Sequence, residues 1–401
     1  MDRSKWEYKK LGDICILLNG FAFKSEKYVD NGIRVMRITN VQKGEIVDDD
    51  PKFYPMSSQS EIQRYMLKEN DLLVSLTGNV GRVGLLQREL LPAALNQRVA
   101  CLRLKGDSTD LRYLFHLMNS DLFENECIVN SQGIAQKNMS TKWLSDYKLP
   151  VPPKEDQQRI VAELDCLNEM IAVKQEQLKE FDKLAQSIFY DMFGDPVVNP
   201  NRWESKTLER LIQDNIILYH LDGNHGGDYP RREEFVEQGV SYIGANNIKD
   251  GYIDFSGVKY LTEEKANTLR KGIAKNEDVL FAHNATVGPV ALLRTTEEKV
   301  VLSTSLTAYR CNKQSLLPLF LKSYMGSTWF VNQYIHTMKQ ATRNQVPITQ
   351  QRKMSFILPP LSLQQQFADK ISAIEAQKEL VKQSIAETQA LLDYTMDKYF
   401  G

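Results

Sequence analysis

Residues 70–86 read NDLLVSLTGNVGRVGLL, and residues 277–293 read EDVLFAHNATVGPVALL. The two stretches align without a gap at an offset of 207 residues, and each is typical of two short strands joined by a glycine-containing turn. The same offset relates Asn40 to Asn247 and Phe193-Gly194 to Phe400-Gly401. A repeat of this length indicates two tandem domains of one design rather than a solenoid.

The two copies begin at Trp6-Glu7 and Trp203-Glu204, which are separated by only 197 residues. The second copy therefore carries about ten additional residues, and we place them near residues 218–237. A chain of 401 residues has room for two domains that each bury a core of their own.

The composition indicates a protein of a reducing, aqueous compartment. Five cysteines without a C-x-x-C pair argue against a disulfide framework and against a tetrahedral zinc site. No apolar run approaches the length of about 18 residues that a membrane helix needs, and the first ten residues are rich in charge. We expect a soluble, cytoplasmic protein with no membrane segment.

The formal net charge of −1 conceals an uneven distribution. Residues 1–150 hold 21 basic and 19 acidic side chains, and residues 197–358 hold 20 and 16. The segments that follow them are acidic, with 5 basic and 10 acidic side chains in 151–196 and 4 and 6 in 359–401. This division permits local DNA-binding faces on the globular parts but does not require them.

Each copy contains short apolar runs, bounded by turn residues, that predict strands. These runs are 33–38, 71–76, 83–86 and 99–104 in copy one, and 240–243, 278–281, 290–293 and 306–310 in copy two. Residues 111–126 and 318–334 have helical spacing of apolar residues. The globular part of each copy is therefore predicted to be mixed α and β.

A long amphipathic helix is predicted after the proline pair that closes each copy. Its apolar positions alternate by four and three residues, which is the pattern of a coiled coil. They are 160, 164, 167, 171, 174, 178, 181, 185, 188 and 192 in copy one, and 367, 371, 374, 378, 381, 385, 388, 392, 395 and 399 in copy two. We expect the two helices to pair antiparallel and to return Gly401 to the neighbourhood of Met1. The alternatives are pairing across a homo-oligomer and packing of each helix on its own copy.

Motifs for catalysis are missing from the sequence. It has no phosphate-binding G-x-x-x-x-G-K-[ST] loop, no H-E-x-x-H and no G-x-S-x-G. The glycine-rich residues 78–84 lack a phosphate-binding lysine and are interpreted as a turn. His220, Asp222 and His225 have the chemistry of metal ligands, but copy one has no equivalent, so we predict neither a metal site nor a catalytic residue.

Both copies carry polar residues near strand ends that suit base edges and phosphates. Arginine can pair with guanine, asparagine and glutamine can pair with adenine, and lysine mostly neutralises phosphate. The candidates in copy one are Arg34, Arg37, Thr39, Asn40, Lys43, Ser75, Thr77, Asn79, Arg82, Gln97, Arg98, Lys137 and Asn138. Those in copy two are Asn246, Asn247, Lys249, His283, Asn284, Thr286, Thr304, Arg343, Asn344 and Gln345. Their recurrence at matching places with different identities is expected of two similar domains that read different sequences.

This arrangement resembles the specificity subunit of type I restriction-modification systems, over essentially the whole chain. The most specific local matches are residues 70–81 and 277–288, together with the domain exits at 149–160 and 357–367. The resemblance implies an α+β fold in which two target-recognition domains, 1–153 and 197–360, alternate with two helical segments, 154–196 and 361–401. These helices would form an antiparallel coiled coil with pseudo-two-fold symmetry.

The resemblance also implies a non-catalytic subunit that reads an asymmetric, bipartite site in double-stranded DNA. Such a subunit docks two modification (methyltransferase) subunits and, through them, restriction subunits. S-adenosylmethionine, ATP and Mg²⁺ are then expected on the partner subunits, and no cofactor on this chain. The alternative function is an adaptor with two protein-binding heads on a coiled coil. A stand-alone methyltransferase or nuclease would need a cofactor or metal constellation that we do not find.

Overall fold

A computed structural model describes residues 3–131, 138–196, 198–224, 229–338 and 344–401. The chain forms two compact units. Unit 1 comprises residues 1–175 and 382–401, and unit 2 comprises residues 176–381. Each unit contains the globular part of one repeat, here named domain 1 (residues 3–153) and domain 2 (residues 198–360), together with parts of two long helices.

Domain 1 is built from short strands and helices in an order that domain 2 repeats. Its strands are β1 (Glu7–Lys10), β2 (Cys15–Asn19), β3 (Ile33–Met36), β4 (Phe53–Tyr54), β5 (Leu72–Ser75), β6 (Val83–Leu85), β7 (Ala93–Leu95), β8 (Val99–Leu104) and β9 (Lys148–Val151). Its helices are α1 (Leu11–Ile14), α2 (Gln59–Ile62), α3 (Leu111–Met118), α4 (Asp121–Val129) and α5 (Thr141–Asp146). One sheet has the order β2-β8-β5-β6, and a second has the order β4-β3-β7.

The two sheets of domain 2 contain more strands than those of domain 1, because additional strands pair at their edges. Its strands are β10 (Glu204–Thr207), β11 (Ile217–Asp222), β12 (Phe235–Val236), β13 (Val240–Ile243), β14 (Ile248–Lys249), β15 (Tyr252–Ile253), β16 (Lys259–Leu261), β17 (Ile273–Ala274), β18 (Val279–Ala282), β19 (Val290–Leu292), β20 (Val300–Leu302), β21 (Leu306–Cys311) and β22 (Ser355–Leu358). Its helices are α7 (Leu208–Gln213), α8 (Glu263–Thr268), α9 (Pro318–Met325), α10 (Thr328–Met338) and α11 (Ile348–Gln351). The sheets have the orders β11-β21-β18-β19-β15-β14 and β12-β16-β13-β20-β17.

The central strands are buried on both faces, which explains their continuous apolar sequences. Alternate residues of β5 point to opposite faces of its sheet. Leu72 and Val74 pack in the cluster that includes α3 and α4, whereas Leu73 packs in the cluster that includes Met36 and Leu95 of the second sheet. Domain 2 repeats this layering with β18, whose Phe281 faces the helices and whose Leu280 faces the other sheet.

The first and last strands of each domain close it into a unit. β1 pairs antiparallel with β9, and β10 pairs antiparallel with β22. The stretches 111–126 and 318–334, whose apolar residues have helical spacing, are helical but not continuous. Each stretch forms two helices, because Ser120 and Ser327 accept a hydrogen bond from the N–H three residues later and start a new helix there.

The long helices are α6 (Lys154–Phe193) and α12 (Leu361–Phe400), and both begin directly after a proline pair. The buried Gln157 anchors the start of α6, since its amide donates to the carbonyls of Ser108 and Pro152 and accepts from the N–H of Asp110. The copy-equivalent Gln364 makes the same three contacts at the start of α12, with Ser315, Pro359 and Leu317. The repeat thus attaches both helices to their domains in one way.

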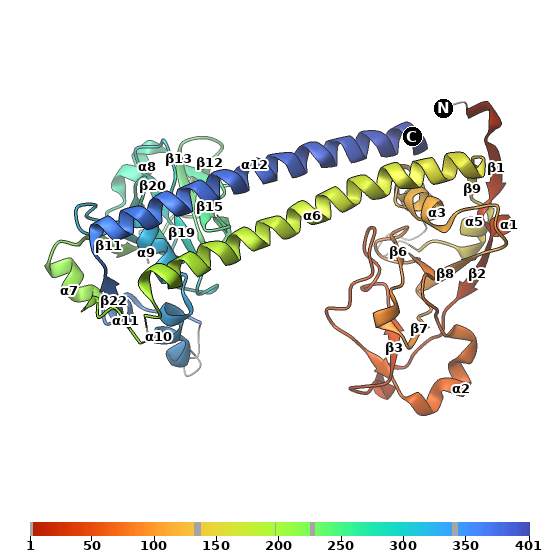
Figure 1. Ribbon diagram of the computed structural model, residues 1–401, viewed down its shortest axis with the longest axis horizontal. Coiled ribbons are helices and arrows are strands. Elements are labelled where there is room, and N and C mark those ends of the chain that lie inside the picture. The colour runs from red at the N-terminus through yellow and green to blue at the C-terminus, as the bar shows by residue number, and fades with distance from the viewer. Residues whose placement is uncertain (1–2, 132–137, 197, 225–228, 339–343) are drawn as a thin grey trace. The chain divides into compact units, whose positions relative to one another are not determined.

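The two helices run antiparallel within each unit (Figure 1). In unit 1 the hydroxyl of Tyr399 donates to Glu163 at 2.5 Å, and the Lys174 ammonium donates to the Thr388 hydroxyl at 2.7 Å. Eleven residues forward along α6 therefore correspond to eleven residues backward along α12. In unit 2 the Lys378 ammonium reaches Asp182 at 2.7 Å. The predicted pairing of the two helices within one chain is confirmed.

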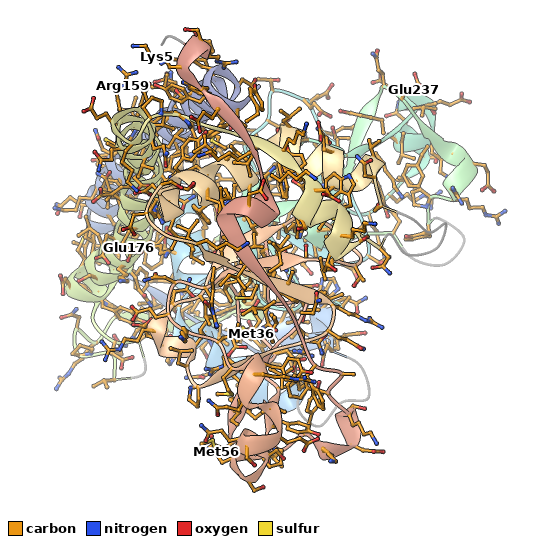
Figure 2. All side chains as sticks on the ribbon, turned by 90° about the vertical axis from the view of Figure 1, so that its right-hand side faces the viewer. Lys5, Met36, Met56, Arg159, Glu176 and Glu237 are labelled. Carbon is orange, nitrogen blue, oxygen red and sulfur yellow. The ribbon has the colours of Figure 1, made fainter. Side chains whose placement is uncertain are left out.

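The C-terminal end of α12 lies against the N-terminal segment of unit 1. The Arg3 guanidinium donates to the backbone carbonyls of Lys398 and Gly401. Figure 2 shows Lys5 and Arg159 at one end of unit 1 and Met56 at the other, with Met36 between them. Among the described residues, no helix combines the length and the apolar composition that crossing a bilayer requires.

Candidate functional site

Four segments meet at one edge of domain 1, where strands β3, β5 and β7 end. The N–H of Asn96 donates to the carbonyl of Met36 at 3.1 Å, and the N–H of Leu76 donates to that of Arg98 at 2.9 Å. The N–H of Met139 in turn donates to the carbonyl of Leu76 at 2.8 Å. Residues 36–40, 75–82, 95–98 and 138–139 therefore form a continuous rim, here named loop edge 1.

Domain 2 assembles the same rim from the residues at an offset of 207. The N–H of Ser303 donates to Ile243 at 2.8 Å, that of His283 donates to Ser305 at 3.0 Å, and that of Val346 donates to His283 at 2.8 Å. These are the copy equivalents of the three bonds in domain 1. Loop edge 2 accordingly comprises residues 243–247, 282–289, 302–305 and 344–346.

The loop edges collect many of the candidate DNA contacts, and several of their side chains are exposed. The exposed candidates are Thr39, Asn79, Gln97, Arg98 and Asn138 on loop edge 1, and Asn246, Thr286, Asn344 and Gln345 on loop edge 2. Thr77 and Asn138 pair as a backbone bridge, as do Asn284 and Gln345 at the equivalent place. Thr77, Asn284 and Thr304 are half-buried. The structure therefore offers two rims with one backbone frame and different polar side chains.

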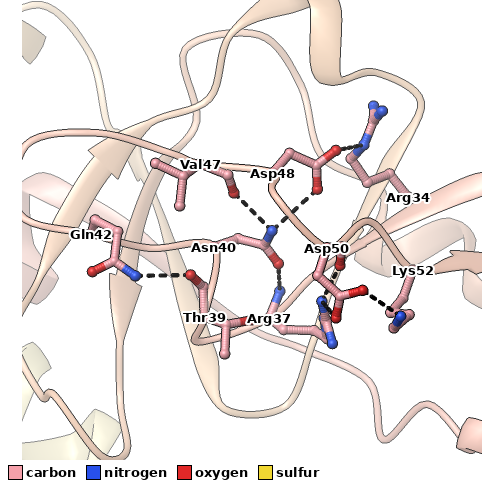
Figure 3. A network of polar contacts seen from close by, with 9 residues as sticks. All are labelled: Arg34, Arg37, Thr39, Asn40, Gln42, Val47, Asp48, Asp50 and Lys52. Carbon is pink, nitrogen blue, oxygen red and sulfur yellow. Dashed lines mark hydrogen bonds and ion pairs between the residues drawn. The ribbon is translucent and has the colours of Figure 1, made fainter. Parts of the chain in front are cut away.

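Two candidates have a structural role instead. Asn40 is 3% exposed, and its amide accepts from the N–H of Arg37 and donates to the carbonyl of Val47 and the carboxylate of Asp48 (Figure 3). Asn247 is also buried and accepts from the N–H of Gly244 in the equivalent turn. Both amides hold the turn after a strand, so we leave them out of the proposed DNA contacts.

The arginines beside this turn are held by acidic side chains of the same domain (Figure 3). Arg34 pairs with Asp48 through Nε at 2.6 Å, and its Nη1 donates to the carbonyl of Leu90. Arg37 donates to Asp50, which also binds Lys52 at 2.5 Å. Hydrogen bonding to Lys52 holds the pKa of the Asp50 carboxyl below its usual range. These cations would have to leave an internal partner before they reached a phosphate.

Three further cations are held by polar or acidic side chains of their own domain. Lys43 binds Asp121 and Glu124 on α4, and Arg82 donates to Gln42 at 2.5 Å. Burial lowers the pKa of Lys43, but its hydrogen bonds to the two carboxylates outweigh burial, and the pKa lies above its ordinary value. In domain 2 Lys249 pairs with Asp254. Lys43 and Lys249 lie outside the loop edges, and Arg82 of loop edge 1 is half-buried.

Ser75 and His283 are buried at the strand ends. The Ser75 hydroxyl donates to the carbonyl of Asn79 at 2.5 Å and accepts from the N–H of Arg82 at 3.0 Å, which fixes the turn. His283 is 4% exposed, and its Nδ1 lies 2.9 Å from the hydroxyl of Thr307. The candidates Lys137 and Arg343 lie outside the described residues.

Sequence reasoning missed one segment of each rim. Phe21 joins loop edge 1, because its N–H donates to Leu95 and its carbonyl accepts from Gln97. Gly20 makes this approach possible, since a Cβ there would lie 2.2 Å from the backbone of Asn96. Gly223 is used in the same way against Ser303. The two glycines are not related by the main offset, so the repeat did not reveal them.

Two exposed basic positions beside these segments were also missed. Arg64 precedes Tyr65, whose ring packs on Phe21 at 5.2 Å. In domain 2 the carbonyl of the exposed Lys271 accepts from the buried amide of Asn224 at 2.6 Å. A single charged residue in a turn carries no sequence signal that separates it from an ordinary surface residue.

The remaining sequence hypotheses concern the glycine-rich stretch and the histidines. Of the residues 78–84 that were predicted to form a turn, 78–82 lie in the turn between β5 and β6, and Val83 and Gly84 belong to β6. His220 is buried and bonds to Gln351, while His225 lies outside the described residues. Within the described parts of the chain, no group of three or more His, Cys, Asp and Glu side chains is arranged to hold a metal ion.

Known proteins share this sequence pattern and this fold. The sequence model of the family described as Type I restriction modification DNA specificity domain matches residues 3–182 and again residues 203–390. The chain belongs to this family. As a member with two specificity domains, it is a DNA-specificity subunit of a type I restriction-modification system and not a catalytic subunit.

Curated relatives carry the same description. The EcoBI specificity subunit of Escherichia coli is 19% identical over 405 residues, which cover 95% of this chain and 81% of that protein. The EcoKI specificity subunit of E. coli K12 is 19% identical, covering 95% and 84%. The MjaVIII specificity subunit of Methanocaldococcus jannaschii is 27% identical over 187 residues, covering 46% of this chain and 44% of that protein.

Solved structures of type I systems share the fold. The S subunit from M. genitalium aligns with a TM-score of 0.55 and 14% identity, covering 99% of this chain and 96% of that one. A chain from a study of complex assembly and conformational transition of the type I restriction-modification system aligns with a TM-score of 0.59 and 19% identity, covering 99% and 97%. The predicted class of two tandem α+β domains with two long helices is confirmed.

Proposed function

We propose that loop edge 1 and loop edge 2 each read one half of an asymmetric, bipartite site in double-stranded DNA. The observation that carries this proposal is the repetition of one backbone frame with different exposed side chains. Thr39, Gln97 and Arg98 occupy positions whose equivalents in domain 2 are Asn246, Thr304 and Ser305. Because base identity is read by side-chain hydrogen bonding in the grooves, the two rims would select different sequences.

The exposed candidates have the chemistry that base reading needs. The amides of Gln97, Asn344 and Gln345 can pair with adenine, and the guanidinium of Arg98 can pair with guanine. The missed residues Arg64 and Lys271 stand beside the rims, where a cation would neutralise a phosphate and add affinity without sequence preference. The paired cations, such as Arg34, would instead maintain the shape of the rim.

We further propose that the helix pair docks two modification subunits. Apolar side chains are exposed on both helices, and apolar patches on a protein surface often mark contacts with another protein. In unit 1 they are Met170, Val173, Leu391 and Tyr394, and in unit 2 they are Leu184 and Leu380, with exposed fractions of 44–67%. Val173 and Leu380 are copy equivalents, as are Leu184 and Leu391. Equivalent apolar positions on both helices support two docking sites of one kind.

The proposal also includes the cofactors of the partner subunits, the restriction subunits and the cellular location. The modification subunits would bind S-adenosylmethionine and would link the chain to restriction subunits that use ATP and Mg²⁺. The complex would act in the cytoplasm, where its DNA is. The acidic balance of 151–196, with 5 basic and 10 acidic side chains, supports a role of the helices in binding protein rather than DNA.

Co-expression of the chain with its cognate modification subunit in a host without DNA methylation tests the proposal. Genome-wide mapping of N6-methyladenine should reveal a split, asymmetric motif with a constant gap. Binding of the complex to a duplex that contains the motif should weaken steeply as salt rises, because cations contact phosphate. A stable complex that adds no methylation and binds DNA without salt dependence would refute DNA reading and would favour a protein-binding adaptor.

A further inference from the structure

Domain 2 contains a buried polar network directly beneath loop edge 2. Its members are His220 on β11, His283 at the end of β18, Thr307 and Tyr309 on β21, and Gln351 on α11. Each of these residues is at most 6% exposed. Buried polar groups are costly unless they are bonded to one another, so the arrangement of their hydrogens is strongly constrained.

The orientation of the Gln351 amide follows from its contact with a backbone carbonyl. The carbonyl of Val346 can only accept a hydrogen bond, so the side-chain nitrogen of Gln351 must face it, at 2.8 Å. The amide oxygen then faces the Tyr309 hydroxyl at 2.6 Å and the Nε2 of His220 at 3.1 Å. Because this oxygen is an acceptor, His220 must carry its proton on Nε2.

The network also reaches His283 through Thr307. The side-chain nitrogen of Gln351 donates to the Thr307 hydroxyl at 3.2 Å. This hydroxyl lies 2.9 Å from Nδ1 of His283. Because a hydroxyl can accept two hydrogen bonds as well as donate one, its contact with His283 forms with either tautomer of the imidazole. Gln351 is thus linked to the rim through Thr307 and His283.

Domain 1 builds the same fold without any of these polar groups. The equivalents of His283, Thr307, Tyr309 and Gln351 at the offset of 207 are Leu76, Ala100, Leu102 and Leu144. The equivalent of His220 is Leu17, because each pairs with the matching residue of the next strand. All five apolar residues belong to or pack against one core cluster. The architecture of the domain therefore does not depend on the network.

We propose that Gln351 is a positioning residue that sets the half-site preference of domain 2 from beneath loop edge 2, without touching DNA. Gln351 holds the carbonyl of Val346, and the N–H of Val346 holds the carbonyl of His283. The exposed Asn344 and Gln345 directly precede Val346, and Gln345 pairs with Asn284. A change at Gln351 is transmitted to these side chains through the backbone of residues 344–346.

A purely structural role explains the network less well. A buried polar network is rarely more stabilising than apolar residues of similar volume, but it can select one arrangement among several. Domain 1 shows that leucine at this position supports the fold. The polar set in domain 2 is therefore attributed to the exact placement of a rim that carries amide side chains, which recognise bases only within narrow geometry.

The functional test rests on the proposed function and compares two matched variants. Gln351→Met keeps the length of the side chain and removes its hydrogen bonds, and Leu144→Met changes the equivalent residue of domain 1. Each chain is co-expressed with the modification subunit, and methylation is mapped genome-wide. We expect Gln351→Met to reduce base discrimination in one half of the motif by about tenfold, as for a lost base contact. The other half of the motif, and both halves for Leu144→Met, should be unchanged.

A second test separates this inference from the proposed function, because it needs no DNA. Amide hydrogen exchange is measured on the full chain, together with the nitrogen NMR shifts of its five histidines. We expect the amide of Val346 to lose at least about tenfold of its protection in Gln351→Met, whereas the equivalent amide of Met139 keeps its protection. His220 should carry its proton on Nε2 in the unaltered chain, because that nitrogen faces the amide oxygen of Gln351.

The outcomes that overturn the inference are specific. An unchanged motif with undiminished discrimination in Gln351→Met contradicts it, as does unchanged exchange at Val346 or a neutral His220 whose proton lies on Nδ1 rather than on Nε2. Absence of any methylation by the unaltered chain counts against the proposed function instead, and the exchange and NMR results then decide the positioning role by themselves.

Discussion

Arg103 donates two hydrogen bonds, each of 2.7 Å, to the carboxylate of Asp71, which is 4% exposed. The copy-equivalent Arg310 binds Asp278 in the same bidentate way, at 2.8 and 2.7 Å. Asp71 and Asp278 also accept a backbone N–H at the turn that leads into β5 and β18, from Lys68 and Lys275. Each pair therefore ties a central strand to its neighbour and fixes the turn before it.

Loss of this arginine should destabilise its own domain. Arg103→Met leaves the buried carboxylate of Asp71 without a cation, and we expect a loss of about 3 kcal/mol in the free energy of unfolding. Urea denaturation followed by tryptophan fluorescence measures it. Asp71→Asn combined with Arg103→Met removes the charge as well and should recover part of the loss. A single variant as stable as the unaltered protein would show that the pair contributes nothing.

Asn40 and Arg98 should differ in the kind of defect they produce. Asn40→Ala removes three hydrogen bonds from a buried turn and should lower stability by about 1–3 kcal/mol. Arg98→Ala alters an exposed side chain of loop edge 1 and should leave thermal unfolding unchanged while it weakens binding to the motif about tenfold or more. Calorimetry and duplex titration distinguish them. Equal stability of the two variants, or equal affinity, would contradict this sorting of the candidates.

Lys378 occupies an apolar heptad position, and its side chain is 8% exposed beside Asp182. Lys378→Met replaces the cation with a side chain that suits the position and should be neutral or stabilising. Asp182→Ala leaves the buried ammonium without this partner and should destabilise unit 2 by about 1–3 kcal/mol. Thermal unfolding of the full chain compares the two. The reverse ranking would mean that the ion pair is worth more than apolar packing.

Stability should fall in mild acid because of His220. Burial lowers the pKa of this imidazole to about 4, against an ordinary value of 6.5. Between these values the unfolded chain binds a proton that the folded chain does not, so stability is lost as pH falls from about 6.5 to about 4. The loss from this group is about 3 kcal/mol. Unfolding measured at pH 7 and pH 5 should show a smaller difference in His220→Leu than in the unaltered chain.

Burial also lowers the pKa of His116, despite the opposing hydrogen bond that its Nε2 makes to the Asp165 carboxylate, and this adds a dependence of stability on pH of the same sign. This contribution should persist in His220→Leu. A pH dependence that is identical in both chains would show that His220 is protonated to the same extent in the folded and unfolded states.

The sequence predicted most of the fold because the repeat and the apolar periodicity are both local signals. The expected strand 99–104 is β8 and the expected strand 240–243 is β13, residue for residue. The helical spacing over 111–126 and 318–334 did not reveal where one helix ends and the next begins, because it continues through Ser120 and Ser327, whose hydroxyls cap new helices. A capping serine and a serine within a helix look alike in a single sequence.

The candidate site was predicted in outline only. Strand-end positions brought Thr39, Asn79 and Arg98 to one rim, as expected of residues that follow adjacent strands. The sequence could not distinguish these from Asn40, whose amide holds a buried turn, or from Arg34, whose partner Asp48 lies in a different segment. Long-range ion pairs of this kind depend on the tertiary fold. The DNA contacts themselves stay a prediction.

The most direct test of the central claim is an exchange of domain 2. Residues 197–358 are replaced by the corresponding domain of a relative that reads a known half-site, and N6-methyladenine is mapped in the presence of the modification subunit. We predict that one half of the bipartite motif changes to the half-site of the donor while the other half stays the same. A change in both halves, or in neither, would contradict the claim that each domain reads its own half of the DNA site.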